Sequence, residues 1–142
     1  AVLEVVEPFF AMAISKGNKI DLDVTEDVYL KGDREAIKQL VSLLLDNAIK
    51  YCNNGGKIFV SVSIKAKFVK LSVSNTLERI EQGKHDRLFD RFYRADDSRN
   101  SKTGGSGIGL AVAKEIVEAH SGSITAFSKD GKSIDFDVLL PH

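Results

Sequence analysis

Three polar side chains gather on one edge of a strongly predicted helix. Asn47 lies seven residues after Leu40 and three after Leu44, so it falls on the apolar face of that helix. Lys50 and Tyr51 follow three and four residues later and extend the same edge. A buried amide costs free energy unless it finds a hydrogen-bond partner. Asn47 is therefore either a satisfied core asparagine or part of a polar binding site.

A glycine stretch further along the chain offers a second candidate for chemistry. Gly105, Gly107 and Gly109 lack side chains where an amphipathic run, Leu110 to His120, begins. The free N–H groups and the dipole at a helix start favour an anion there. The stretch is either a phosphate-binding turn or an ordinary glycine-containing loop, and by itself it does not decide between them.

Composition limits the classes of protein that this chain can belong to. A length of 142 residues predicts one domain, and a start at Ala1 instead of Met suggests a piece of a longer protein. With 20 basic and 20 acidic residues, nothing indicates a surface for nucleic acid. The single cysteine, Cys52, excludes an internal disulfide and fits a reducing compartment. No apolar run is long enough to be inserted in a membrane.

The hydrophobic pattern predicts helices that alternate with pairs of strands. The expected elements are a helix over 2–16, strands over 19–24 and 28–30, a helix over 34–51, strands over 57–64 and 68–74, a long polar connection over 75–105, a helix over 107–120, and strands over 123–128 and 133–140. This order favours an α+β fold, a two-layer sandwich with a mixed, mostly antiparallel sheet and about three helices on one face. This connection has only a short helical pattern, around Asp86 to Phe92. A polar connection of this length predicts a functional lid or a disordered loop.

Four blocks in a fixed order carry a resemblance to a known family. They read LLDNAIKY at 44–51, VSNT at 73–76, LFDRFYR at 88–94 and GSGIGL at 105–110. Together they resemble the N, G1, F and G2 boxes of the catalytic ATP-binding domain of sensor histidine kinases, within the gyrase/Hsp90/histidine kinase/MutL ATPase superfamily. The resemblance covers nearly the whole chain, 1–142. It implies a Bergerat-type sandwich with a flexible ATP lid.

The resemblance also implies a role for individual residues toward ATP and Mg²⁺. Asn47 is the expected Mg²⁺ ligand, because an amide oxygen is a hard donor that leaves room for phosphates and water. Lys50 would supply a point charge to phosphate oxygens, and Tyr51 would pack at the ribose or base. Asn75 would accept a hydrogen bond from the adenine amine, with Ile80 anchoring the G1 block. The remaining expected nucleotide contacts are Gly105, Gly107, Gly109, Leu110 and Arg94. Lys102 is a further possible charge partner of the phosphates. The alternative for Arg94 and Lys102 is that they are charged loop residues exposed to solvent.

The function implied is transfer of the ATP γ-phosphate to a histidine on a separate dimerisation domain of the same parent protein. A response regulator would act through that domain, and the chain would be the cytoplasmic part of a membrane-anchored sensor. Related ATPases that hydrolyse ATP carry a glutamate where Leu43 stands, which favours transfer to a protein over transfer to water. Phe89 and Phe92 would contact the dimerisation domain; packing in the core beneath the lid is the alternative for both.

The G1 block departs from the family pattern. Asn75 replaces an aspartate, and Leu77 and Arg79 stand where glycines are expected. The first change removes charge assistance from adenine recognition, and the others add side chains near the base. We therefore expect weakened ATP binding. A degenerate kinase-like domain that acts through protein contacts is the alternative, whereas a dinucleotide-binding oxidoreductase is disfavoured because the glycines come late and not after a first strand.

Overall fold

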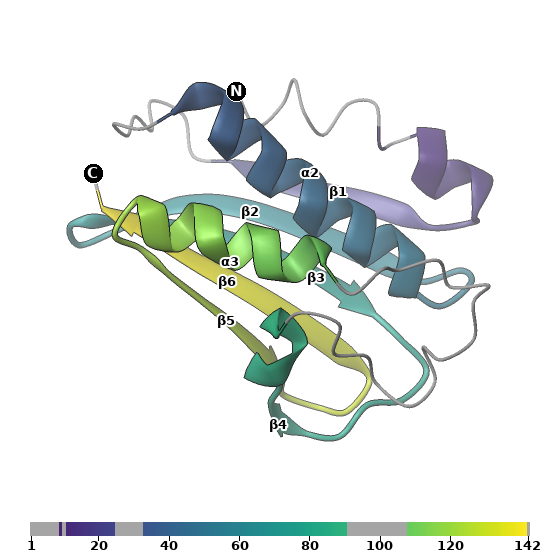
Figure 1. Ribbon diagram of the computed structural model, residues 1–142. Helices are drawn as coiled ribbons and strands as arrows, with labels where there is room; N and C mark the ends of the chain where they lie inside the picture. The colour runs from purple at the N-terminus through teal and green to yellow at the C-terminus, as the bar shows by residue number, and fades with distance from the viewer. Residues whose placement is uncertain (1–8, 10, 25–32, 91–107, 142) are drawn as a thin grey trace.

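The computed structural model describes residues 9, 11–24, 33–90 and 108–141, and within them one open sheet carries helices on one face (Figure 1). The strand order is β1-β2-β3-β6-β5-β4. Strand β1 runs parallel to β2, and the other described pairs are antiparallel. The elements are β1 (Lys19–Val24), α2 (Arg34–Tyr51), β2 (Lys57–Lys65), β3 (Phe68–Thr76), β4 (Gly83–Lys84), the 3₁₀ helix η1 (Asp86–Phe89), α3 (Gly109–Ala119), β5 (Ser123–Ser128) and β6 (Ser133–Pro141). The predicted α+β sandwich is confirmed.

Helix α2 begins at a side-chain cap. The Asp33 carboxylate accepts hydrogen bonds from the N–H groups of Glu35 and Ala36, at 3.0 and 3.3 Å. These are among the N–H groups that no carbonyl within the helix can reach. The buried stripe of α2 follows the predicted spacing and consists of Leu40, Val41, Leu44, Leu45 and Ala48. Local sequence thus determines both the start of α2 and the face that it buries.

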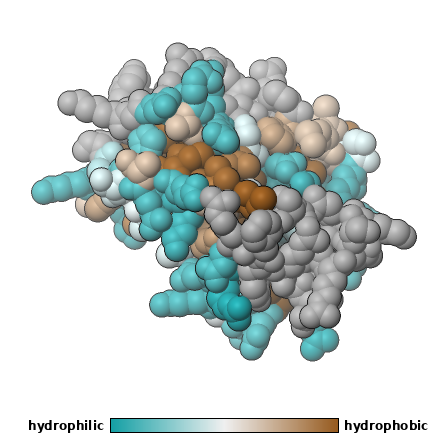
Figure 2. Space-filling view, viewed as in Figure 1, coloured by the Kyte–Doolittle hydropathy of each residue, from teal (hydrophilic) through white to brown (hydrophobic). Residues whose placement is uncertain are grey.

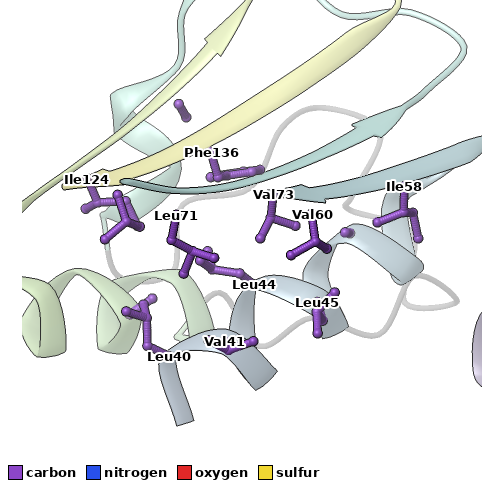
Figure 3. Close-up of a cluster of buried hydrophobic side chains, with 14 of the residues drawn as sticks. Leu40, Val41, Leu44, Leu45, Ile58, Val60, Leu71, Val73, Ile124 and Phe136 are labelled. Atoms are coloured by element: carbon purple, nitrogen blue, oxygen red, sulfur yellow. The ribbon is translucent and has the colours of Figure 1, made fainter. Parts of the chain in front are cut away.

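The core lies between the helices and the sheet. Alternate residues of the strands are buried, because successive side chains of a strand point to opposite faces. In Figure 3 the inward side chains of the strands and those of α2 point toward one another. The buried strand positions include Ile58, Val60, Val62, Val69, Leu71, Val73, Ile124, Phe136 and Val138.

His120 joins the two helices at one end. It is the C-cap of α3, and its Nε2 accepts a hydrogen bond from the Asp33 N–H at 3.2 Å. Its Nδ1 lies 2.8 Å from the Ile116 carbonyl oxygen. Since a neutral ring that accepts at Nε2 carries its proton on Nδ1, the ring donates to that carbonyl. His120 therefore ties the start of α2 to the end of α3, which is a structural role.

The N-terminal part of the chain is described in part. Residues 9 and 11–15 are helical, while the rest of the predicted helix over 2–16 and the predicted strand over 28–30 lie outside the described residues. Gly17, with φ of 81°, ends this helix. The Gly17 N–H donates to Ile14 O at 2.9 Å and the Asn18 N–H donates to Ala13 O at 2.8 Å. A glycine with positive φ is a common way for a helix to end.

The predicted polar connection over 75–105 is wrong in its first half. Asn75 and Thr76 complete β3, and β4 pairs with β5 at the edge of the sheet. Helix η1 follows and places Phe89 in the core. These residues belong to the sheet and its packing and not to a lid; residues 91–107 lie outside the described part. Strand β4 could not be predicted from the sequence, because a strand of two residues shows no detectable alternation of polar and apolar side chains.

Among the described helices, none has the length and apolar character of a membrane span.

Candidate functional site

The last turns of α2 bring together three of the predicted site residues. Asn47 and Tyr51 are half-buried, and Lys50 is exposed. The Lys50 Nζ lies 3.1 Å from Oδ2 of Asp46, one turn earlier, in an ion pair that solvent reaches. Such a pair contributes only about 0–1 kcal/mol, so Lys50 can exchange this carboxylate for a phosphate at little cost. Half-burial places Asn47 at the edge of the core, within reach of both the protein interior and solvent.

Lys16 holds this end of α2 in place. Its ammonium group donates hydrogen bonds to the carbonyl oxygens of Ile49 and Lys50, at 2.5 and 2.9 Å. Carbonyls in the last turn of a helix have no partner within the helix, and a cation is favoured at that negative end of the dipole. Lys16 therefore fixes the turn of α2 that carries Asn47 and Lys50.

Asn75 is a buried polar residue with an unused acceptor. It lies on β3, in the same inward row as Leu71 and Val73, and is 1% exposed. Its Nδ2 donates to the backbone carbonyl of Thr76 at 3.1 Å. Its Oδ1 is buried and has no hydrogen-bond partner among the described residues. A buried acceptor without a donor costs about 1–3 kcal/mol, so this oxygen is suited to a ligand that brings an N–H group.

A network of hydrogen bonds surrounds Thr76, next to Asn75. The Thr76 hydroxyl donates to Oδ1 of Asn53 at 2.7 Å and accepts from the Lys57 N–H at 3.0 Å. The Thr76 carbonyl also accepts from the Asn53 N–H at 3.3 Å. A Cβ on Gly56 would lie 2.3 Å from both side-chain oxygens, so only glycine allows this approach. The network joins the end of β3 to the turn that follows α2.

The segment after β3 is held against the turn between β5 and β6. The Leu77 N–H donates to Lys132 O and the Ile80 N–H donates to Gly131 O, both at 2.9 Å. Leu77 and Ile80 pack against the core, and Arg79 is exposed. Leu77 and Arg79 do not have positive φ, so this path does not require the glycines that the family pattern carries. The segment that follows β3 is therefore held in place by the β5–β6 turn, and Arg79 is exposed to solvent.

The start of α3 has no side-chain cap from its own N-cap residue. Ile108 occupies the N-cap position and offers no side-chain hydrogen bond, in contrast to Asp33 at the start of α2. The helix opens with Gly109 and Leu110, both half-buried. A Cβ on Gly109 would lie 3.6 Å from Cδ2 of Leu43, so Leu43 lies beside this start. The free N–H groups of such a terminus suit an anion.

Phe89 is a core residue. It is 4% exposed, and its ring meets that of Phe136 edge to face, with centroids 6.0 Å apart. The packing interpretation left open by the sequence therefore applies to Phe89, because a buried ring is not presented to a partner domain. The other predicted contacts Phe92, Arg94, Lys102, Gly105 and Gly107 lie outside the described residues.

The structure adds residues that the sequence did not single out. Lys16, Asn53 and Thr76 act through partners that lie 23 to 34 positions away in the chain. No local signal in the sequence marks Lys16 or Asn53 for these contacts. Figure 2 shows a band of hydrophobic residues where α2 and α3 lie, edged by hydrophilic residues. The partly buried hydrophobic residues of the two helices include Ile37, Leu43, Leu110 and Ile116.

Comparison with known proteins gives matches to histidine kinases and related ATPases. A family model described as "Histidine kinase-, DNA gyrase B-, and HSP90-like ATPase" matches residues 32–142. The chain is 35% identical over 127 residues to the signal transduction histidine-protein kinase BaeS of Escherichia coli K12, covering 89% of this chain and 27% of BaeS. It is 40% identical over 118 residues to the sensor histidine kinase WalK of Bacillus subtilis, covering 82% of this chain and 19% of WalK.

Solved structures agree on the fold. The catalytic domain of the histidine kinase ThkA is similar with a TM-score of 0.82 at 24% sequence identity, covering 99% of this chain and 89% of that one. At this identity the likeness shows a common fold. The chain spans 19% to 27% of the length of the two relatives above, so it corresponds to one part of such proteins.

Proposed function

The chain belongs to the histidine kinase-, DNA gyrase B- and HSP90-like ATPase family, and we propose that it is the ATP-binding catalytic domain of a sensor histidine kinase. In this role it transfers the γ-phosphate of ATP to a histidine on a separate dimerisation domain. A response regulator then receives the phosphoryl group from that histidine. The domain works on the cytoplasmic side of a sensor protein, where ATP is available.

The unpartnered Oδ1 of Asn75 is the observation that carries the proposal. It is a buried acceptor to which no residue in the described part of the chain donates, on the strand that leads into the segment holding Ile80. The exocyclic amine of adenine is a donor that satisfies it. Because Asn75 is neutral, this hydrogen bond is weaker than one to a carboxylate, and we expect ATP affinity to be reduced but present.

The end of α2 and the start of α3 supply the phosphate end of the site. Lys50 provides a positive charge, and the N–H groups of the first turn of α3, at Gly109, favour phosphate oxygens. The Asn47 amide oxygen suits Mg²⁺, which accepts few protein ligands and keeps its waters and phosphates. When bound, Mg²⁺ neutralises charge on the phosphates. The residues of the chain orient the nucleotide, which is the main protein contribution to phosphoryl transfer.

Two observations support a phosphate acceptor outside this chain. Leu43, packed next to Gly109, has no group that could take a proton from water. His120 is engaged by Asp33 and Ile116 within the fold, so it is not a free nucleophile. Both observations support transfer to a histidine on another domain of the parent protein.

A second candidate function is a degenerate domain that binds partner proteins and not ATP. The replacement of a charged acceptor by Asn75 favours it. The path of the segment after β3 opposes it, since Arg79 is exposed and the backbone reaches Ile80 without positive φ. The two candidates differ in one measurable property, which is nucleotide binding.

Calorimetric titration of the chain with ATP, with and without Mg²⁺, tests the proposal. We expect Asn47→Ala to weaken binding of Mg-ATP by about 10-fold or more, which corresponds to about 1.4 kcal/mol. Asn54→Ala is the matched control, because Asn54 is exposed in the turn after α2. Equal binding by Asn47→Ala and Asn54→Ala would refute the metal role, and no binding by the unmodified chain would favour the second candidate.

Transfer itself is tested with the parent protein. The full-length kinase, incubated with labelled ATP, should form an acid-labile phosphohistidine outside residues 1–142. Label on His85 or His120 instead would overturn the assignment of the acceptor.

A further inference from the structure

We infer that the Thr76 carbonyl, held in place by Asn53, fixes the orientation of the Asn75 amide and makes the site select bases that present an amino group over bases that present a carbonyl. The inference rests on the proposed function, because it concerns how the same site distinguishes one purine from another. It assigns Asn75 as the residue that determines specificity, and Thr76 and Asn53 as residues that position it.

An asparagine at this place could in principle read either kind of base. One end of its amide is an acceptor and the other is a donor, and a rotation of the group exchanges them. With Oδ1 toward the ligand it would pair with an amine, and with Nδ2 toward the ligand it would pair with a carbonyl. A carboxylate has no such choice, since it only accepts. Asn75 therefore needs a partner within the protein if it is to discriminate.

Thr76 supplies that partner. The Asn75 Nδ2 donates to the Thr76 carbonyl at 3.1 Å, and this leaves Oδ1 as the end without a partner. If the amide turned over, Oδ1 would face the Thr76 carbonyl oxygen, and two acceptors would meet in a buried place. The rotated state loses one hydrogen bond and gains a repulsion, which disfavours it by about 10-fold or more. Asn75 thus presents its oxygen, as a carboxylate would.

The Thr76 carbonyl is itself held from the other side. It accepts from the Asn53 N–H at 3.3 Å, while the Thr76 hydroxyl donates to the Asn53 side chain at 2.7 Å and accepts from the Lys57 N–H at 3.0 Å. Gly56 lets these groups approach, since a Cβ there would lie 2.3 Å from both side-chain oxygens. The end of β3 is therefore fixed to the turn after α2 by backbone and side-chain contacts. Loss of the hydroxyl would remove two of these three hydrogen bonds and loosen the end of β3 that carries the carbonyl.

ATP and inosine triphosphate provide the test, because they differ only at positions 6 and 1 of the purine. ATP has an amino group at position 6 and no proton on N1, whereas inosine triphosphate has a carbonyl group at position 6 and a proton on N1. Calorimetry of the unmodified chain with Mg²⁺ should give about 10-fold tighter binding of ATP than of inosine triphosphate. Thr76→Val keeps a β-branched side chain and removes the hydroxyl, and it should narrow the ratio to about 2-fold or 3-fold. Thr125→Val is the matched control, since Thr125 is exposed on β5, and it should keep the full ratio.

The ratio of affinities separates positioning from general damage, because a merely structural loss weakens both nucleotides equally. If Thr76→Val does not fold, Asn53→Ala provides the same comparison, and the ratio for the unmodified chain stands without any variant. Equal binding of the two nucleotides by the unmodified chain would overturn the inference and leave the proposed function intact. A full ratio in Thr76→Val would also overturn it. Absence of binding by either nucleotide would remove both the inference and the proposed function.

Discussion

Replacement of Lys16 by methionine tests whether the end of α2 depends on a contact from a distant part of the chain. Methionine keeps most of the apolar stem and removes the ammonium group that bonds Ile49 O at 2.5 Å and Lys50 O at 2.9 Å. The last carbonyls of α2 then lose a charged donor.

The size of the effect follows from these two contacts. A hydrogen bond to a charged group contributes about 1.5–3 kcal/mol, and exposure of the second contact reduces its share. A cation at a helix C-terminus adds about 0.3–1 kcal/mol. We expect Lys16→Met to lower the free energy of unfolding by about 2 kcal/mol, or the Tm by roughly 7 °C for a domain of this size. Affinity for Mg-ATP should fall as well, because the same turn carries Asn47 and Lys50.

Urea unfolding followed by circular dichroism measures this loss, with Lys19→Met as the matched control. Lys19 has a side chain that is 73% exposed and lies 3.8 Å from Asp21, so its replacement should change the free energy of unfolding by about 0.5 kcal/mol or less. If the two variants unfold at the same urea concentration with the same slope, the anchoring role of Lys16 is refuted.

Two further predictions concern turns next to the site. Gly56→Ala should lower the free energy of unfolding by about 2–3 kcal/mol, because its Cβ would lie 2.3 Å from the side-chain oxygens of Asn53 and Thr76; a loss below about 0.5 kcal/mol in urea unfolding would contradict this close approach. At the β5–β6 turn, the hydrogen bond from the Lys132 N–H holds the pKa of the Asp130 carboxyl below its ordinary value. A lowered pKa in the folded state means that Asp130 stabilises the fold above its unfolded pKa of about 3.9 and that this contribution is lost as the pH falls through the folded pKa. NMR titration of the Asp130 carboxyl carbon measures that pKa, and a value at or above the ordinary one would show that the turn does not stabilise the charge.

The order of elements and their buried faces could be predicted from sequence because they arise from contacts between near neighbours. The period of 3.6 residues specifies the stripe of α2 around Leu40 and Leu44, and alternation specifies the inward rows of β2 and β3. Asp33 and Gly17 act on backbone groups within five residues of themselves. The fold class, and the family through its four blocks, follow from patterns of this kind.

Other features depend on residues that only the folded chain brings together. The short strand β4 pairs with β5, which lies more than 40 positions later, and the Phe89 ring packs against Phe136. Neither contact could be predicted from the residues next to β4 or Phe89 in the sequence. The predicted lid was too long for this reason. A side chain in a polar segment can still be a core residue when a distant strand covers it.

The features of the candidate site also fall into those predicted from local sequence and those that depend on the folded chain. The sequence by itself placed Asn47, Lys50 and Tyr51 on one edge of a helix and marked Asn75 as an altered acceptor, because residue type and helical spacing are local properties. Only the tertiary structure decided which end of the Asn75 amide is presented and what anchors the end of α2. Those outcomes depend on Thr76 meeting Asn53, and on Lys16 meeting Ile49 33 positions away. A hydrogen bond is effective only at a short distance and in one direction, and no pattern in the sequence specifies either before the chain folds.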